Sequence, residues 1–144
     1  MKYPQVIFPL RNTLTRYCLR NYATTKRTTQ NLINYPKVKL GEGKLLYLLI
    51  SIYMHGETLF SRTIVRGGRA KKHLYLYDEI REELDELGLC SKALGGGMMN
   101  INAKSQEMTI NGKCKTFGRA DHHLTKEILL GTPEYKNFKI TVGK

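Results

Sequence analysis

The run KLLYLLISIYM, residues 44–54, limits the fold of this chain more than any other feature. It is continuously apolar and contains β-branched and aromatic residues, a pattern typical of a strand that is buried on both faces. A second strand pattern, residues 58–65, follows across His55-Gly56-Glu57. The short connection with a central glycine predicts that the two strands pair as a hairpin.

Two further segments show the spacing of amphipathic helices. In KKHLYLYDEIREELDELG, acidic residues crowd one side and a largely apolar face lies opposite. That face holds His73, Tyr77, Ile80, Leu84 and Leu87. Gly88 follows where a glycine commonly ends a helix. A second helix is predicted in GRADHHLTKEILLG, which ends at Gly131 with Pro133 beyond it.

Three consecutive glycines, residues 95–97, come directly before another strand pattern. Apolar and polar residues then alternate over 99–102 and 108–111, which predicts a hairpin turning around Lys104-Ser105-Gln106. FKITV, near the C-terminus, is a short final strand. Together these elements favour an α+β fold with a single mixed β-sheet of about six strands flanked by two helices. The glycines indicate either a hinge or a place where another group approaches the backbone closely.

Basic residues are concentrated at the N-terminus. The chain has 24 Lys and Arg against 12 Asp and Glu, and residues 1–41 hold eight of the basic residues and no acid. We therefore divide the chain into a basic leader or disordered tail, 1–35, and one folded domain, 36–144. Pro36 and Gly41-Glu42-Gly43 mark the boundary between them. The leader is acid-poor and amphipathic, as mitochondrial presequences are, although a disordered basic tail explains it nearly as well.

Several classes of protein are disfavoured by the composition. Cys18, Cys90 and Cys114 fit neither a disulfide framework nor a paired metal motif, which favours a reduced, intracellular and cytosolic protein. A mitochondrial location is the alternative, through the presequence-like N-terminus. No apolar run has the length of roughly 20 residues that crosses a bilayer. Nucleic-acid binding ranks last, because the N-terminal aromatic residues are not arranged with the cations as a stacking platform. We expect a monomer with no metal, no cofactor and no membrane partner.

His73 is the most informative single residue of the sequence. It lies in the first turn of its predicted helix, on the face directed at the core. Partial burial, the positive end of the helix dipole and the neighbouring Lys71 and Lys72 all disfavour the charged imidazolium. A neutral imidazole can accept a proton, so His73 is a candidate general base. The alternative, commoner for a lone histidine, is a packed ring that is hydrogen-bonded to backbone.

The stretch NGKCKTFGRADHH, residues 111–123, is a candidate anion site. It joins a strand to a helix through a glycine-bounded loop, where backbone N–H groups can form a concavity that binds an anion. Three cations would add positive potential around it: Lys113, Lys115 and Arg119. An ordinary connection with solvated charges is the alternative. His122 and His123 are a poor metal pair, because adjacent helical residues point about 100° apart.

The order of these pieces resembles the phosphohistidine phosphatase family, also called the janus family, and within it the insect janus-B/ocnus branch. The similarity extends over roughly residues 43–142 and rests on four blocks. These are IVRG (64–67), HLYLYD (73–78), ALGGGMMN (93–100) and KTFGRADHH (115–123). The resemblance implies a mixed sheet flanked by two helices. It also implies a metal-independent hydrolase that removes phosphate from phosphohistidine, with a phosphohistidine-containing protein as its partner.

The resemblance also assigns roles to individual residues. His73 matches the family's catalytic histidine, the base that activates water for attack on phosphorus. Cys114-Lys115-Thr116 matches the segment whose backbone amides hold the phosphate. The residues expected to support this pocket are Gly96, Gly97, Arg119 and His122. For the glycines, this favours close packing beside the phosphate pocket over a hinge.

Three positions depart from the family pattern. Leu46 and Met98 stand where active members carry cations, and Cys114 stands where a hydroxyl is expected. Lys44, two residues earlier on the same strand face as Leu46, is the candidate substitute for a phosphate-binding cation. Charge-assisted hydrogen bonds contribute roughly 1.5–3 kcal/mol each, so these losses predict a slow enzyme. The alternative is a catalytically weakened phosphatase-fold protein that regulates or binds a partner, with a role in sex differentiation or the male germline.

Overall fold

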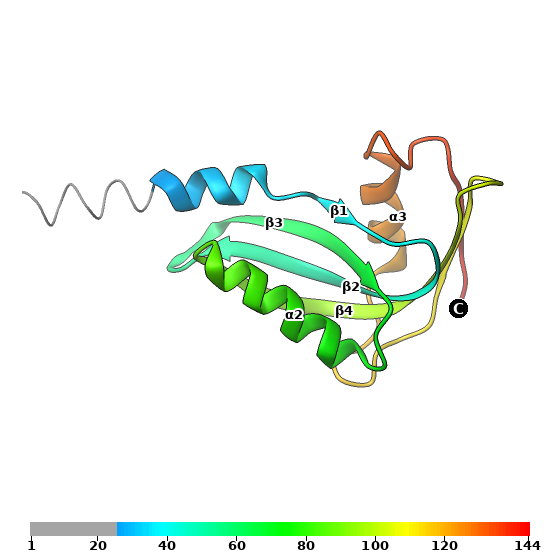
Figure 1. The fold of residues 1–144 in the computed structure, drawn as a ribbon, viewed down its shortest axis with the longest axis horizontal. Coiled ribbons are helices and arrows are strands. Elements are labelled where there is room, and N and C mark those ends of the chain that lie inside the picture. The colour runs from blue at the N-terminus through cyan, green and yellow to red at the C-terminus, as the bar shows by residue number, and fades with distance from the viewer. Residues whose placement is uncertain (1–25) are drawn as a thin grey trace, which may run out of the picture.

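The computed structural model describes residues 26–144, which form one mixed sheet with helices packed against it (Figure 1). Residues 26–34 are helical. The elements that follow are β1 (Val38–Lys39), β2 (Gly43–Met54), β3 (Glu57–Gly68), α2 (His73–Glu86), β4 (Leu89–Asn102), β5 (Glu107–Asn111), α3 (His122–Leu130) and β6 (Lys139–Val142). The six strands lie in the order β1-β3-β2-β4-β5-β6. The outer pairs β1–β3 and β5–β6 are parallel and the inner pairings are antiparallel. The predicted α+β fold with a single mixed sheet is confirmed.

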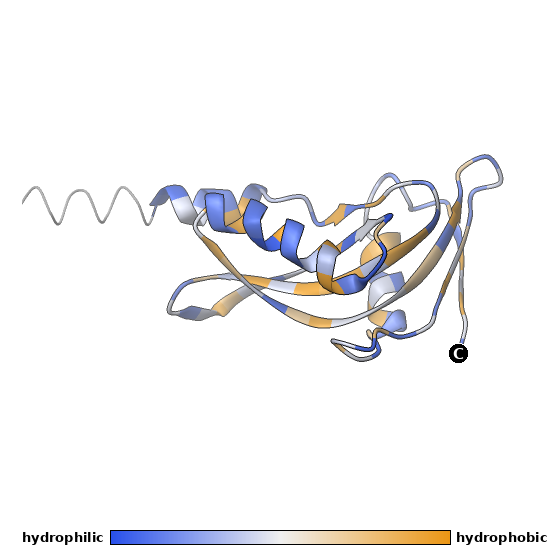
Figure 2. Cartoon of the chain, turned by 60° about the horizontal axis from the view of Figure 1, so that its bottom comes forward, coloured by the Kyte–Doolittle hydropathy of each residue, from blue (hydrophilic) through white to orange (hydrophobic). Residues whose placement is uncertain are grey.

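The strand β2 lies at the centre of the sheet, as its apolar run predicted. It pairs with β3 on one side and β4 on the other, and residues 47–50 are all buried. Alternate side chains point to opposite faces of a strand and therefore enter two different cores. The core on the α3 side receives Leu45, Tyr47 and Leu49. The core on the α2 side receives Leu48, Ile50 and Ile52. Figure 2 shows hydrophobic residues along the strands and mainly hydrophilic residues on the visible face of α2.

Both helices end at the residues that the sequence indicated. α2 begins at His73, and Gly88 adopts a left-handed φ of +73° just beyond the helix. At the start of α3, the Asp121 side chain accepts a hydrogen bond from the backbone N–H of Leu124 at 3.1 Å and caps the helix. Gly131 stands at the other end of α3. His73 therefore stands at the N-terminus of α2, and His122 at the N-terminus of α3.

Both predicted hairpins are present, but the second one differs from the prediction in where its first strand begins. β4 starts at Leu89 and runs through the three glycines, which were expected to precede the strand. Glycine has a weak preference for strands, so the pattern alone argued for an earlier break. In the fold, residues 95–97 stay paired with β2, with a shift of register between Leu49 and Ile50. The glycines are therefore part of the sheet.

The segment 26–35 packs on the domain, although the predicted division between leader and domain placed it outside. Leu32 and Tyr35 are each 4% exposed and belong to the core on the α2 side. Arg62 of β3 donates hydrogen bonds to three backbone carbonyls at the end of this helix, at 2.6–2.9 Å. The rest of the predicted leader, residues 1–25, lies outside the described residues.

Candidate functional site

His73, the first residue of α2, is half-buried and packs against β4. Its Nε2 lies 2.8 Å from the carbonyl oxygen of Gly97. Because a carbonyl only accepts, this contact requires the proton on Nε2, and a neutral ring then keeps its lone pair on Nδ1. No hydrogen bond from the described part of the chain engages Nδ1. The bond to backbone is what a packed histidine would make, and it also orients a ring with a free basic nitrogen.

The glycines of β4 leave room for groups that touch the strand directly. A Cβ on Gly96 would lie 2.9 Å from Cδ2 of His73 and 3.0 Å from Cβ of Cys114. A Cβ on Gly95 would lie 2.7 Å from the backbone of Ala120. These distances are well below ordinary carbon–carbon contacts, so a side chain at either position would displace its neighbours. Close approach, rather than a hinge, is the reason for glycine here, as the sequence favoured.

The edge of β4 changes its partner at this point. Pairing with β5 ends at Met98 and Asn111. Two residues earlier, the backbone N–H of Gly96 donates instead to the carbonyl of Gly118, at 3.0 Å. Gly97 lies between these two pairings, and its carbonyl accepts the bond from the imidazole of α2. The loop between β5 and α3 therefore leaves the sheet and returns to it beside the histidine.

The loop of residues 114–118 closes on itself in a tight arrangement. The N–H of Cys114 donates to the carbonyl of Gly118 at 3.2 Å, and the N–H of Gly118 donates to the carbonyl of Cys114 at 2.9 Å. The N–H of Phe117 donates to Sγ of Cys114 at 3.4 Å. No hydrogen bond within residues 26–144 engages the N–H groups of Lys115 and Thr116. Cys114 thus holds the loop through its buried sulfur, and the two residues after it keep free backbone donors, as an anion site requires.

His122, expected to support the pocket, lies on the opposite face of β4 from His73. Its Nε2 is 2.8 Å from the carbonyl of Gly112, and its Nδ1 is hydrogen-bonded to the hydroxyl of Tyr47. Burial raises the pKa of Tyr47 to about 12, so the phenol remains a donor. A Cβ on Gly97 would lie 2.8 Å from both of these rings. His122 therefore supports β4 and the start of the loop from the face opposite to His73.

Comparison with known proteins identifies the relatives of this chain. Residues 32–139 match the family model described as the Janus/Ocnus family. The chain belongs to the Janus/Ocnus family. It is 48% identical over 126 residues to sex-regulated protein janus-B of Drosophila pseudoobscura pseudoobscura, and the match covers 88% of each chain. Janus-B proteins of Drosophila erecta and Drosophila melanogaster are 46% and 45% identical over 112 residues, covering 78% of this chain and 80% of each relative. The resemblance to the janus family is confirmed.

In this member of the Janus/Ocnus family, the two positions that lack an expected cation are direct neighbours. Leu46 of β2 pairs with Met98 of β4, and both line an open pocket. Lys44 lines the same pocket, which agrees with its predicted place on the face of Leu46. Two cations that sequence reasoning did not single out for this place, Arg69 and Lys71, also line it. Their position could not be read from spacing, because it depends on the path of the chain between β3 and α2.

The side chain and the main chain of Arg119 make separate contacts. Its side chain was predicted to add positive potential around the anion loop. Its Nη2 donates a hydrogen bond to the carbonyl oxygen of Gly143 at 3.3 Å, close to the C-terminus of this Janus/Ocnus chain. The backbone of Arg119 contributes to the site, since it forms a parallel bridge with Gly96. The support from this residue therefore comes through the main chain.

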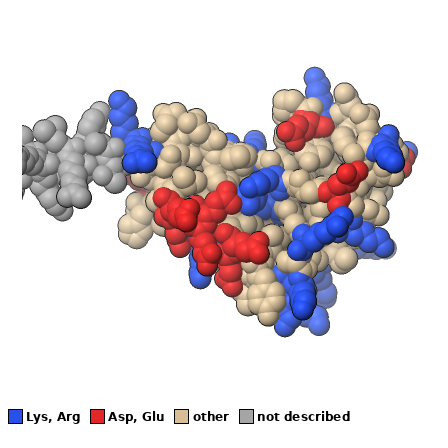
Figure 3. Space-filling model, viewed as in Figure 1, with Lys and Arg blue, Asp and Glu red and all other residues tan. Residues whose placement is uncertain are grey.

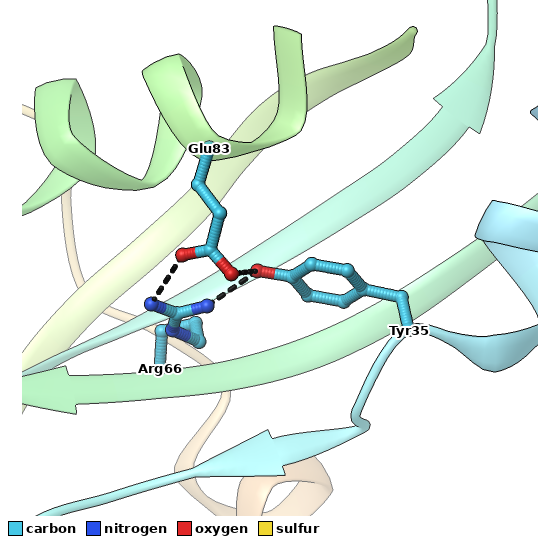
Figure 4. Close-up of polar contacts among 3 residues, drawn as sticks. All are labelled: Tyr35, Arg66 and Glu83. Carbon is cyan, nitrogen blue, oxygen red and sulfur yellow. Dashed lines mark hydrogen bonds and ion pairs between the residues drawn. The ribbon is translucent and has the colours of Figure 1, made fainter. Parts of the chain in front are cut away.

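A buried polar cluster lies away from His73 and was missed by sequence reasoning (Figure 4). Arg66, in the IVRG block, is 9% exposed; its Nη2 lies 3.0 Å from Oε2 of Glu83 in α2, and its Nη1 bonds the hydroxyl of Tyr35. That hydroxyl also donates to Oε1 of Glu83 at 3.2 Å. The hydrogen bond from Arg66 lowers the pKa of Glu83, while burial raises the pKa of Tyr35 to about 12. A cation inside an apolar strand was the available signal, because a buried charge needs a partner.

Two kinds of feature are not found in residues 26–144 of this Janus/Ocnus protein. No three His, Cys, Asp or Glu side chains are grouped as they would be around a metal ion. None of the helices described combines the length and the apolar character needed to cross a membrane.

Proposed function

We propose that this chain is a protein phosphohistidine phosphatase in which His73 acts as the general base, without a metal ion. The observation that carries the proposal is the hydrogen bond from Nε2 of His73 to the carbonyl of Gly97, which leaves Nδ1 as the basic nitrogen. The free N–H groups of Lys115 and Thr116 support it, since they offer an anion two donors in the loop next to this ring.

In the proposed reaction, the N–H groups of Lys115 and Thr116 hold oxygens of the phosphoryl group. Nδ1 of His73 takes a proton from a water molecule as the water oxygen bonds to phosphorus. The P–N bond breaks, and the leaving imidazole nitrogen of the substrate takes up the proton that His73 returns. The products are histidine and inorganic phosphate. A protonatable imidazole is a good leaving group, so positioning and electrostatic stabilisation are sufficient for catalysis.

The test compares two histidine variants of the full chain. Phosphate release from a phosphohistidine peptide is expected to be lost in His73→Ala and retained in His123→Ala, which removes an exposed histidine of α3. Release by the unaltered chain is expected to persist in EDTA, because no step needs a metal. Equal release from His73→Ala and from the unaltered chain would contradict the proposal, and so would loss of activity in EDTA that added metal restores.

A second candidate function is supported by the residues at the clamp positions. Leu46 and Met98 place apolar groups where cations are expected. The sulfur of Cys114 accepts a hydrogen bond from the backbone N–H of Phe117 in the same loop. These features favour a protein that binds a phosphorylated or acidic partner and turns it over slowly. The relatives are named sex-regulated proteins, and on that basis we propose a role in sex differentiation or the male germline for this alternative.

The two candidates separate when the missing cations are restored. In the double variant Leu46→Lys, Met98→Arg, two charge-assisted bonds of roughly 1.5–3 kcal/mol each are regained. Phosphate release is then expected to rise by about two to four orders of magnitude if the clamp limits the rate. If phosphate release does not rise in the double variant, while the unaltered chain binds a phosphorylated peptide, the binding protein is favoured.

We also propose a cytosolic location. Within residues 26–144, Cys90 and Cys114 are both free thiols, as expected in a reducing compartment. A reporter fused to residues 1–35 is expected to stay in the cytosol, and its import into mitochondria would instead support the presequence.

A further inference from the structure

The pocket around Leu46 and Met98 combines an apolar floor with a basic rim. Its volume is about 370 Å³, near the lower end of the range for ligand pockets. The apolar residues that line it are Leu45, Leu46, Ala70 and Met98. The cations that line it are Lys44, Arg69 and Lys71. None of the described residues in this lining is acidic. The pocket therefore suits a group that is apolar at its centre and carries negative charge at its edge.

The pocket adjoins His73 on the same face of the sheet. Met98 is two residues from Gly96, so its side chain emerges on the face where His73 packs against that glycine. Lys71, at the rim, is two residues before His73 in the chain. Beyond Met98, a second hollow of about 260 Å³ continues over β4 and β5. An extended segment that places a phosphohistidine at His73 would run across this pocket.

The charges around the pocket are separated from those of the neighbouring helix. Figure 3 shows acidic side chains gathered over α2 and basic side chains beyond its N-terminal end. The acids of α2 are Asp78, Glu79, Glu82, Glu83, Asp85 and Glu86. An anionic segment is therefore repelled along the helix and attracted at the rim of the pocket. The charges therefore indicate that the occupant is anionic and that it lies across the rim of the pocket rather than along α2.

We propose that the pocket binds the substrate protein next to the phosphohistidine, through a large apolar side chain flanked by carboxylates. The inference rests on the proposed function and names the class of protein segment that the site selects. The apolar side chain contacts Leu46 and Met98, and the carboxylates face Lys44, Arg69 and Lys71 at the rim.

The phosphoryl group itself belongs to the loop and not to this floor. A dianion placed on the side chains of Leu46 and Met98 would lose hydration against a surface that offers no hydrogen-bond donor, which is unfavourable even with cations at the rim. An apolar side chain on the same surface removes both partners from water and is favoured. With Leu46 and Met98 in place of two cations, the pocket therefore favours an apolar residue of the substrate next to the phosphohistidine over the phosphoryl group itself.

The experiment measures binding of labelled peptides to the full chain by fluorescence anisotropy. The parent peptide carries a stable phosphohistidine analogue, a neighbouring leucine and two flanking glutamates. Three matched peptides have serine for the leucine, lysines for the glutamates, or histidine for the analogue. Each is measured with the unaltered chain, with Met98→Arg, and with the control Leu130→Arg, which alters an exposed leucine at the end of α3. A folded state of each variant is checked by circular dichroism.

The leucine peptide is expected to bind about tenfold more tightly than the serine peptide, as burial of one such side chain allows. That preference should vanish in Met98→Arg and remain in Leu130→Arg, and the lysine peptide should bind more weakly than the parent. Equal affinities for the leucine and serine peptides, a preference unchanged in Met98→Arg, or no binding of any peptide would overturn the inference. If instead the leucine preference holds but the analogue and histidine bind equally, the pocket stands and the proposed phosphatase function fails.

Discussion

Replacing Gly96 by alanine would put a methyl group where three neighbours already crowd β4. The new Cβ would lie 2.9 Å from Cδ2 of His73, 3.0 Å from Cβ of Cys114 and 3.0 Å from the carbonyl oxygen of Tyr47. Ordinary carbon–carbon contacts are about 3.5–4.0 Å, so the imidazole must retreat by roughly 0.6–1.1 Å. The backbone of β2 has no comparable freedom. Overpacking of this kind costs about 1–3 kcal/mol of unfolding free energy.

The retreat of the ring has a consequence that is separate from stability. The bond from Nε2 of His73 to the carbonyl of Gly97 is 2.8 Å long, and a shift of this size takes it beyond about 3.2 Å, the usual limit of such bonds. Misplacing a catalytic group by about 1 Å lowers a rate by about 10²-fold. Gly96→Ala should therefore show both a lower urea midpoint by circular dichroism and phosphate release slower by about two orders of magnitude.

Gly131→Ala is the matched control for this experiment. Its Cβ would meet only two backbone oxygens, of Glu127 and Ile128, at 3.5 Å, and its φ of −76° suits any residue. Its stability should be unchanged or slightly higher, because alanine restricts the unfolded chain. If Gly96→Ala unfolded at the same urea concentration as this control and left the NMR signals of the His73 ring in place, the close packing described for β4 would be refuted. The stability and NMR readouts hold whether or not the chain is an active enzyme.

Three further predictions concern polar contacts that stabilise the fold. The hydrogen bond from Arg66 holds the folded-state pKa of Glu83 below its ordinary value of 4.5. The pair therefore stabilises the fold above pH 4.5, and this contribution is lost as the pH falls through the lower folded-state pKa. Glu83→Gln should flatten the dependence of the urea midpoint on pH in this acid range. Arg62→Ala removes three hydrogen bonds to backbone carbonyls and should destabilise the fold by about 1–3 kcal/mol, with faster hydrogen exchange over residues 26–34. Tyr47→Phe leaves the buried imidazole of α3 without its donor and should cost about 1–3 kcal/mol in chemical unfolding.

Local patterns predicted the elements of the fold well, because each of these elements carries its own signal. The apolar run of β2 indicated a strand with two buried faces, and Gly88 and Gly131 indicated where the helices end. Contacts between distant segments carried no such signal. The two residues of β1 pair with Val65 and Arg66 of β3, and nothing in their own sequence requires it.

The candidate site was predicted in its parts but not in its arrangement. His73 and the glycines could be named from sequence, and the structure brings them together with Cys114. The hydrogen bond between Tyr47 and His122 joins residues 75 positions apart, which no local spacing indicates. The hydrogen bond from Arg119 to the carbonyl of Gly143 was not predicted either, because charge alone does not indicate the partner of a long side chain.

The glycine segment of β4 separates the imidazoles of His73 and His122, which stand at the N-termini of α2 and α3. The peptide of Gly97 holds one ring through its carbonyl, while the other ring fills the space that a side chain of Gly97 would need. Changes at this strand therefore act on both sides of the sheet at once, whereas exposed positions such as Lys44 and Met98 can change one at a time. In an evolving lineage, residues that line the pocket could therefore change one by one, whereas a change between the two rings would need a compensating substitution on the other side of the strand.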